Sequence, residues 1–157
     1  MELLATKGGR EVWLRHIDRP LVFERPFSER HYVAIVFNDD ASISDGERHY
    51  LTQAMFATGC RYGVFAGHQC EDWEWALDTA CIESALETKP SDDEFTMTTS
   101  HKNESVEDVI FFGLNNTSFD SHDFERILIL FVGTRSGLRD EVEAAIRSVW
   151  FEGSGSA

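Results

Sequence analysis

The sequence predicts an α/β fold, a three-layer sandwich with a mainly parallel central sheet of four or more strands, Rossmann-like or flavodoxin-like. The first observation is a set of short apolar runs of the kind that strands covered on both faces require; the clearest are residues 31–37 and 127–132. The second is that a helical pattern follows each run after a short connection. With 157 residues, the chain is long enough for one such domain and too short for two comfortable ones.

Residues 1–30 are predicted to form an N-terminal arm or edge strands. Apolar pieces at 12–14 and 21–23 are interrupted and followed by Pro20 and Pro26. Proline has no backbone N–H for the ladder of a central strand, so we expect these pieces to lie at an edge or outside the sheet.

From residue 31 onward, strands and helices alternate. Ser44 and Glu47 have the spacing of a capping box, and Gly59 suits the left-handed end of the helix that follows. Further strands are expected at 62–66, 95–99 and 127–132, and further helices at 71–87, 105–114 and 138–151. We therefore expect a single domain over residues 1–152, with 153–157 a linker or tag remnant.

The charge is strongly negative and unevenly distributed. The formal net charge is −14, and residues 71–108 hold twelve acidic residues opposed by Lys89 and Lys102 alone. Such a field repels nucleic acid and anionic membranes and attracts a basic partner or a cation. Solvated helix faces that merely keep the chain soluble are the alternative explanation.

Location and cofactors are constrained by simple counts. No apolar run is long enough to cross a bilayer, and the N-terminus lacks the pattern of a secretory signal. The three cysteines are odd in number and include no Cys-x-x-Cys pair, which favours free thiols in a reducing cytoplasm. We expect no cofactor.

The densest group of reactive side chains lies at residues 67–73, between a predicted strand and a predicted helix. A thiol at a helix N-terminus feels the positive end of the helix dipole, which lowers its pKa. With His68 or His101 as base and Asp39 to orient it, Cys70 could serve as a hydrolase nucleophile. The neighbouring carboxylates would raise the thiol pKa, however, and a buried structural cysteine is the alternative.

Two other kinds of site, for a metal and for a phosphate, would lie at the same predicted edge of the sheet, where the carboxyl ends of parallel strands meet. Asp39, His68 and His101 could hold a catalytic metal, although they come from separate loops. The glycine-bearing turn at 133–137 could bind a nucleotide phosphate, but it matches no phosphate-loop motif.

Trp73 and Trp75 are two residues apart, so they cannot share one side of a helix. One is expected in the core and the other near the surface. An exposed tryptophan among acidic residues is a typical anchor for a basic partner, and the predicted binding set is Glu71, Asp72, Trp73, Glu74 and Trp75.

The span from about residue 32 to 132 resembles an uncharacterised bacterial family, a domain of unknown function. The resemblance rests on Thr58-Gly59-Cys60, Ala66-Gly67-His68-Gln69-Cys70-Glu71-Asp72-Trp73, Asp78-Thr79-Ala80, and Met97-Thr98-Thr99-Ser100-His101 with Glu104. Members of this family show Cys-x-x-Trp at the start of the helix predicted at 71–87 and Thr-Thr-Trp-His after the third strand. This chain has Ser100 in place of that tryptophan. The family implies no activity.

These observations favour a small, acidic, cytoplasmic bacterial protein that acts by binding a basic protein. An immunity or defence role would suit the charge, because acidic inhibitors cover basic toxins and nucleases by electrostatic attraction. A Cys70/His101 or metal-assisted hydrolase is the alternative, and a nucleotide-sensing domain is a third.

Overall fold

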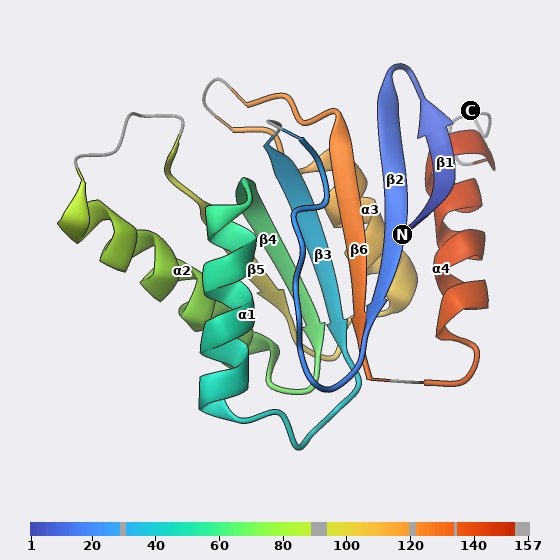
Figure 1. Ribbon diagram of the computed structural model, residues 1–157. Coiled ribbons are helices and arrows are strands. Elements are labelled where there is room, and N and C mark those ends of the chain that lie inside the picture. Colours follow the sequence, from blue (N-terminus) through green and yellow to red (C-terminus); the bar gives the residue numbers. More distant parts are fainter. Residues whose placement is uncertain (29–30, 89–93, 120–121, 134, 153–157) are drawn as a thin grey trace.

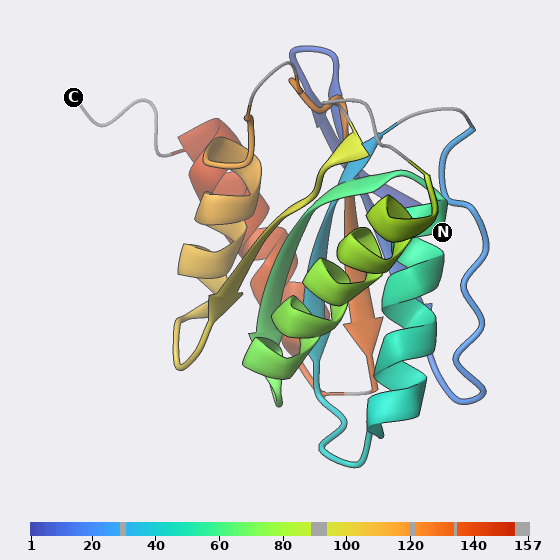
Figure 2. The same ribbon diagram turned by 90° about the vertical axis from the view of Figure 1, so that its left-hand side faces the viewer.

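The computed structural model describes the chain except for residues 29–30, 89–93, 120–121, 134 and 153–157. A six-stranded sheet has the order β1-β2-β6-β3-β4-β5, with helices on both faces (Figures 1 and 2). The strands are β1 (Glu2–Lys7), β2 (Arg10–Ile17), β3 (Tyr32–Asn38), β4 (Cys60–Gly67), β5 (Met97–His101) and β6 (Arg126–Val132). The helices are α1 (Asp45–Ala57), α2 (Cys70–Glu87), α3 (Val106–Asn115) and α4 (Leu138–Arg147), which the π-helical turn η2 (Ser148–Glu152) continues. The predicted tail 153–157 lies outside the described residues.

The predicted α/β sandwich is confirmed, with six strands where four or more were expected. Strands β2, β6, β3, β4 and β5 pair in parallel, and β1 is antiparallel to β2. The connections β3→β4, β4→β5 and β5→β6 each carry one helix, which buries its apolar side against the sheet, whereas no helix lies between β2 and β3 in the described residues. The carboxyl ends of all five parallel strands therefore lie at one edge of the sheet.

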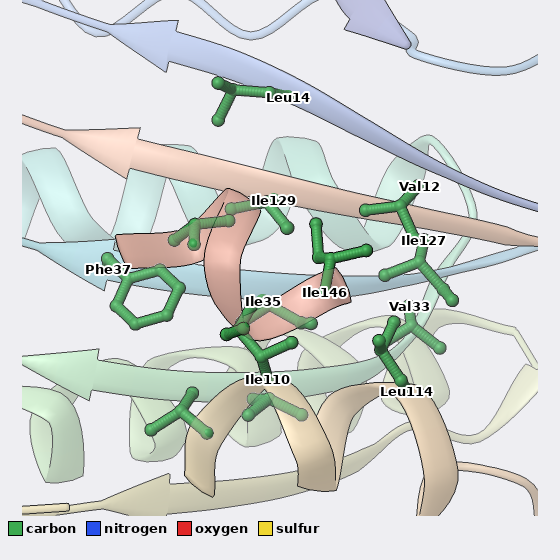
Figure 3. Packing of buried hydrophobic residues seen from close by; sticks show 14 of the residues in the cluster. Val12, Leu14, Val33, Ile35, Phe37, Ile110, Leu114, Ile127, Ile129 and Ile146 are labelled. Atoms are coloured by element: carbon green, nitrogen blue, oxygen red, sulfur yellow. The ribbon is translucent and has the colours of Figure 1, made fainter. Parts of the chain in front are cut away.

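Strand β3 shows how one apolar run serves two cores, because its side chains alternate between the faces of the sheet. Val33, Ile35 and Phe37 pack with α3 and α4, in the cluster shown in Figure 3. Ala34 and Val36 pack on the other face with α1 and α2. A strand buried on both faces has to be apolar at every position, and this explains its continuous run.

The expectation of an edge position for the apolar piece at 12–14 was wrong. Strand β2 is an interior strand that pairs with β1 on one side and with β6 on the other. Pro20 does not interrupt it, because β2 ends at Ile17 and the prolines lie beyond its last ladder position. The piece at 21–23 is not a strand; Leu21 and Phe23 are buried in coil against the α1 and α2 side of the sheet.

Other predicted boundaries are close to those observed. Ser44 and Glu47 form the predicted capping box at the start of α1, and Gly59 has a φ of 108° after its end. Strand β5 occupies 97–101 rather than 95–99, which makes His101 the last residue of the strand. The final helix changes from α to π hydrogen bonding at Ser148.

The chain leaves adjacent strands β3 and β6 toward opposite faces of the sheet. After β3 it enters α1 on one face, and after β6 it enters α4 on the other (Figure 1). In open α/β sheets, ligand sites lie outside the carboxyl ends of strands near such a reversal. The fold therefore directs attention to the loops that follow β3, β4, β5 and β6.

Candidate functional site

A cleft of about 1060 Å³ opens at the carboxyl edge of the sheet. Its walls come from the ends of β3 and β4, the turn after β5, and the residues of α3 and α4 that face one another across the opening. The residues that line the cleft include Phe37, Asn38, Asp39, Ala66, Gly67, His68, Gln69, His101, Lys102, Glu104, Glu107, Arg135, Leu138, Glu141, Ala145 and Ser148. This is the edge at which the sequence placed Asp39, His68 and His101.

Asn38, which is buried at the end of β3, fixes the shape of the rim. Its side-chain amide donates to the carbonyl of His68 at 2.9 Å, and its side-chain oxygen accepts from the N–H of Asp40 at 3.0 Å. Gly67 lies directly beside it with φ of 88°, and a Cβ there would come within 2.2 Å of the Asn38 carbonyl oxygen. Only glycine fits this position, so the loops after β3 and β4 are locked together.

His101 forms part of the cleft wall and is only 7% exposed. Thr99 Oγ1 lies 2.9 Å from its Nε2, and the ring of Phe112 packs against it with centroids 4.7 Å apart. Glu104 Oε2 lies 2.8 Å from Nδ1 but out of line with it, so Nδ1 has an ion-pair contact and no hydrogen bond. The imidazole is thus held firmly with one polar atom unsatisfied.

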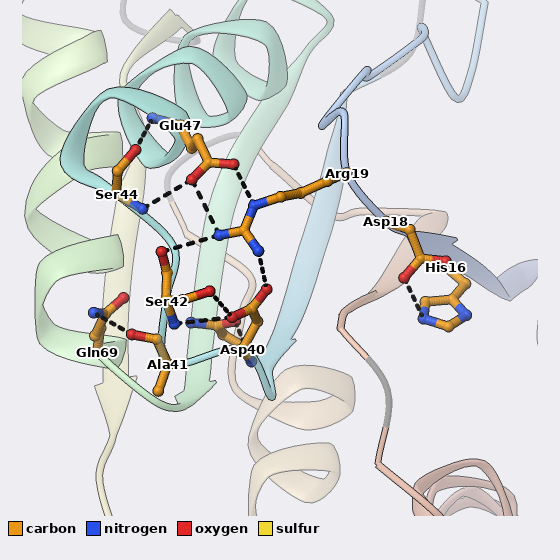
Figure 4. A network of polar contacts seen from close by, with 10 residues as sticks. His16, Asp18, Arg19, Asp40, Ala41, Ser42, Ser44, Glu47 and Gln69 are labelled. Carbon is orange, nitrogen blue, oxygen red and sulfur yellow. Dashed lines mark hydrogen bonds and ion pairs between the residues drawn. The ribbon is translucent and has the colours of Figure 1, made fainter.

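The neighbours Asp39 and Asp40 have different roles. Asp40 accepts from Arg19 at 2.8 Å and from the Ser42 hydroxyl, and Arg19 also donates to Glu47 (Figure 4). The Ser42 contacts, with Arg19, lower the pKa of Asp40, and hydrogen bonds from Arg19 and the Ser44 backbone lower the pKa of Glu47 to about 2. The Asp39 carboxylate, which lines the cleft, makes no ion pair or hydrogen bond within the described part of the chain.

The structure brings Asp39, His68 and His101 to one cleft but does not make them a metal site. Among the described residues, no group of three or more His, Cys, Asp and Glu side chains could hold a metal ion. We therefore correct the interpretation of Asp39, His68 and His101 as ligands of a catalytic metal. The three side chains line the same opening but do not form a group that could share one metal ion.

For Cys70, the geometry supports the buried structural cysteine rather than the nucleophile with a lowered pKa. Cys70 is the first residue of α2 and is buried, and burial raises its pKa. Backbone N–H groups of Glu71 and His101 offset this only in part, while the Glu71 carboxylate raises the pKa further. Cys70 is not among the residues that line the cleft. Its position is that of a packed core thiol, which disfavours the hydrolase interpretation.

The turn at 133–137 does not provide a free phosphate site in its described part. Arg135 pairs with Glu141 at 2.6 Å, and the N-cap of α4 is Gly137, which makes no side-chain cap hydrogen bond. Residue 134 lies outside the described residues. Because carboxylates line the same opening, a phosphate would meet negative charge there, and the described residues of the turn do not favour the nucleotide interpretation.

A second candidate region is the outward face of α2. Trp73 is fully buried and stacks on Phe65 with centroids 6.1 Å apart, so it is corrected from a predicted binding residue to a core residue. Trp75 is 71% exposed. The predicted split of the two tryptophans between core and surface is confirmed, and the surface set becomes Glu71, Asp72, Glu74 and Trp75.

Two further exposed residues on α2 were missed from the sequence. Ile82 is 61% exposed and Leu86 is 82% exposed. They follow Trp75 at intervals of seven and four residues, so all three share one side of the helix. This spacing was readable in the sequence, but the neighbouring Leu77 and Ala80 hid it, because they supply a second apolar stripe that faces the sheet.

Acidic residues border this apolar stripe on both sides. Toward β5, Asp78 accepts from the Thr98 hydroxyl at 2.7 Å; toward α1, Glu83 accepts from Gln53 at 3.1 Å. By helical spacing, Glu71 and Glu74 lie on the β5 side with Asp78, and Asp72 lies on the α1 side with Glu83. We call Trp75, Ile82 and Leu86, with these five acidic residues, the α2 surface.

The comparisons with known proteins identify a family whose function is unknown. The family described as Domain of unknown function (DUF7684) matches residues 14–149. The chain belongs to the DUF7684 family. This confirms the resemblance to an uncharacterised domain family. The search of curated proteins and the search of solved structures each found no match. In the described part of this DUF7684 domain, no helix is long and apolar enough to cross a membrane.

Proposed function

We propose that this protein acts by binding a basic partner protein through the α2 surface. The observation that carries the proposal is the stripe of Trp75, Ile82 and Leu86 on the side of α2 opposite the sheet. A surface helix normally buries its one apolar side and leaves the other polar, whereas α2 is apolar on both. Exposed apolar stripes with a polar border are typical of interaction sites.

The geometry favours an amphipathic basic helix as the occupant. Apolar residues at helical spacing on α2 offer a ridge against which the apolar side of a partner helix packs. Acidic residues on both borders would pair with Lys or Arg flanking that apolar side. A second copy of this chain would set these carboxylates against one another, so the charge opposes self-association through this face.

Tryptophan gives the surface its anchor. Large aromatic residues at the centre of an interface carry a disproportionate share of binding energy, especially when a polar rim excludes water around them. Trp75 stands between Glu71 and Asp78 on the helix, with Asp72 nearby on the other border. Attraction between opposite charges would speed association, and burial of the indole would supply the affinity.

The proposal includes a cytoplasmic location in a bacterium, and a defence or immunity role in which a basic toxin or nuclease is covered. Cys60, Cys70 and Cys81 are free thiols, which supports a reducing compartment. The net charge of −14 supports a basic partner and disfavours direct binding to nucleic acid or an anionic membrane.

Photo-crosslinking tests the proposal in the cells that produce the protein. A crosslinking amino acid replaces Ile82 in one variant and Phe111, an exposed aromatic residue of α3, in the control. We expect position 82 alone to give an adduct with one basic protein, identified by mass spectrometry, and we expect added salt to reduce its yield. Equal adducts at both positions, an adduct with an acidic protein, or a homodimer adduct would contradict the proposal.

A further inference from the structure

The two edges of the sheet differ in how they are protected. Strand β1 forms one edge and β5 the other. An edge strand presents a row of backbone N–H and C=O groups with which another chain can pair, so folded proteins protect such edges with charges, bulges or covering segments. A comparison of the two edges therefore shows where this chain can accept a further strand.

Strand β1 has several of these protections. Its register with β2 shifts near its middle, and such an irregularity bends an edge strand away from a flat ladder. Glu2, at its first position, pairs with Arg139 of α4, and Lys7, at its last position, donates to the carbonyl of Trp150 at 2.5 Å. Both ends of the strand are therefore charged and tied to the helical layer, which opposes pairing along this edge.

Strand β5 lacks these protections in the described part of the chain. Its sequence, Met-Thr-Thr-Ser-His, includes no lysine, acidic residue or proline, and its register with β4 is unbroken. Among the described residues, only those of β4 form backbone-to-backbone hydrogen bonds with this strand. Figure 2 looks toward this edge, where β5 lies between α2 and α3. The edge is therefore open to one more strand.

The first turns of α2 run alongside β5 and bring carboxylates to its edge. The Cys70 thiol accepts from the N–H of the last residue of β5, and Asp78 accepts from the Thr98 hydroxyl near the start of the strand at 2.7 Å. Glu71 and Glu74 lie on the same side of the helix as Asp78. The α2 face of the sheet is therefore acidic beside the open edge.

The side chains of an added strand would alternate between two environments, as those of β5 do. Thr98 faces α2 and its carboxylates, so positions on that side favour Lys or Arg. On the other face lie Met97, which is 46% exposed, and His101, which packs on Phe112. Apolar residues suit that face. The occupant that fits both faces is an extended segment in which basic and apolar residues alternate.

We propose that the free edge of β5 binds an extended segment of a basic partner protein, which adds a strand to the sheet. Backbone hydrogen bonds along β5 supply the affinity, and the carboxylates of α2 select basic side chains. A second copy of this chain at the same edge would set its own Glu71, Glu74 and Asp78 against these carboxylates, so the charge disfavours it. The proposal needs no helix on the α2 surface, because it rests on the main chain of β5.

A matched set of synthetic peptides tests the assignment. The parent peptide alternates Lys and Val, a second version carries a methyl group on every backbone nitrogen, and a third has Glu in place of Lys. Each is titrated into the 15N-labelled full chain and followed by NMR, and amide hydrogen exchange is measured with and without the parent peptide. We expect saturable shifts and slowed exchange at amides within 97–101 with the parent peptide, and no saturation with the other two.

Variants separate edge pairing from general attraction to an acidic protein and from the α2 surface. Met97→Lys adds a like charge at the exposed start of β5 and should weaken the parent peptide about tenfold. Glu74→Gln removes a bordering carboxylate and should weaken it about threefold. Trp75→Ala, and Glu24→Gln in exposed coil beyond β2, should leave the affinity within about twofold.

Four results would overturn the proposal. Two of them are equal binding of the methylated or Glu peptide, and unchanged affinity in both Met97→Lys and Glu74→Gln. The third is loss of binding in Trp75→Ala with retained binding in Met97→Lys, which would assign the peptide to the α2 surface. The fourth is a dimer of the free chain with protected β5 amides, which would assign the edge to a second copy.

Discussion

The two helical layers cover the same sheet in different ways. Helices α1 and α2 lie against one another, bridged by Gln53 and Glu83, and α2 turns a second apolar stripe outward. Ser148, the first residue of η2, donates to Glu107 of α3 at 3.0 Å, yet a cleft opens between α3 and α4 at the carboxyl edge. One layer thus offers a convex surface suited to a macromolecule, and the other a concave site suited to a small molecule.

The largest difference in the free energy of unfolding is expected between substitutions of the two tryptophans of α2. Trp73→Ala removes a fully buried indole stacked on Phe65 and should lower the free energy of unfolding by about 3–5 kcal/mol. Trp75→Ala removes a side chain that is mostly in water, and the change should stay within about 0.5 kcal/mol. Urea denaturation of both variants measures the difference. A large loss with Trp75→Ala would show that its side chain serves packing rather than recognition.

Substitution of Gly67 at the rim of the cleft should lower the free energy of unfolding nearly as much. In Gly67→Ala, a Cβ would come within 2.2 Å of the Asn38 carbonyl oxygen, at a φ of 88° that side-chain-bearing residues rarely adopt. We expect a loss of about 2–3 kcal/mol from strain and backbone displacement. Gly9→Ala, in the β1–β2 turn, shares the positive φ but has open space around its Cβ. Its loss of stability therefore measures the cost of the positive φ without the close contact. Similar losses in both variants would refute the close-contact argument.

Acid should weaken the start of α1 in a defined range of pH. Hydrogen bonds from Arg19 and the Ser44 backbone lower the pKa of Glu47 from 4.5 to about 2 in the folded protein. A lowered folded pKa stabilises the protein above about pH 4.5, and the contribution is lost as pH falls toward 2. Unfolding of the wild type and Glu47→Gln should differ most at pH 6, and the difference should shrink as pH falls below 4.5 and through about 2. A constant difference across this range would count against the ion pair.

Thiol labelling compares Cys60 of β4 and Cys70 at the start of α2 with Cys81, further along α2, and is expected to show the smallest effect. Burial raises the pKa of Cys70, and it raises the pKa of Cys60 to about 12, whereas Cys81 is only half-buried. With iodoacetamide at pH 8, we expect label on Cys81 and on the other two only after unfolding, as read by peptide mass spectrometry. Rapid labelling of Cys70 in the folded protein would restore the hydrolase as a candidate.

Sequence patterns predicted the layers because apolar runs and helical spacing report burial directly. They misplaced β2, because adjacent prolines indicate where a strand ends but not what pairs beside it. They correctly predicted that Asp39, His68 and His101 lie at one edge of the sheet, because the carboxyl ends of parallel strands lie together. They left two interpretations of Cys70 open and did not reveal the cleft between α3 and α4, because both depend on how whole helices pack.

The central claim is recognition of a basic helix by the α2 surface, and a peptide titration tests it most directly. The probe is a synthetic amphipathic helix with leucine on one side and lysine on its flanks, compared with a version in which glutamate replaces lysine. We predict that the lysine peptide alone binds and that its affinity falls steeply with salt. Trp75→Ala should weaken it about thirtyfold, and Phe111→Ala and Asp39→Asn should leave it unchanged. Equal binding of both peptides, or unchanged affinity in Trp75→Ala, would contradict the account.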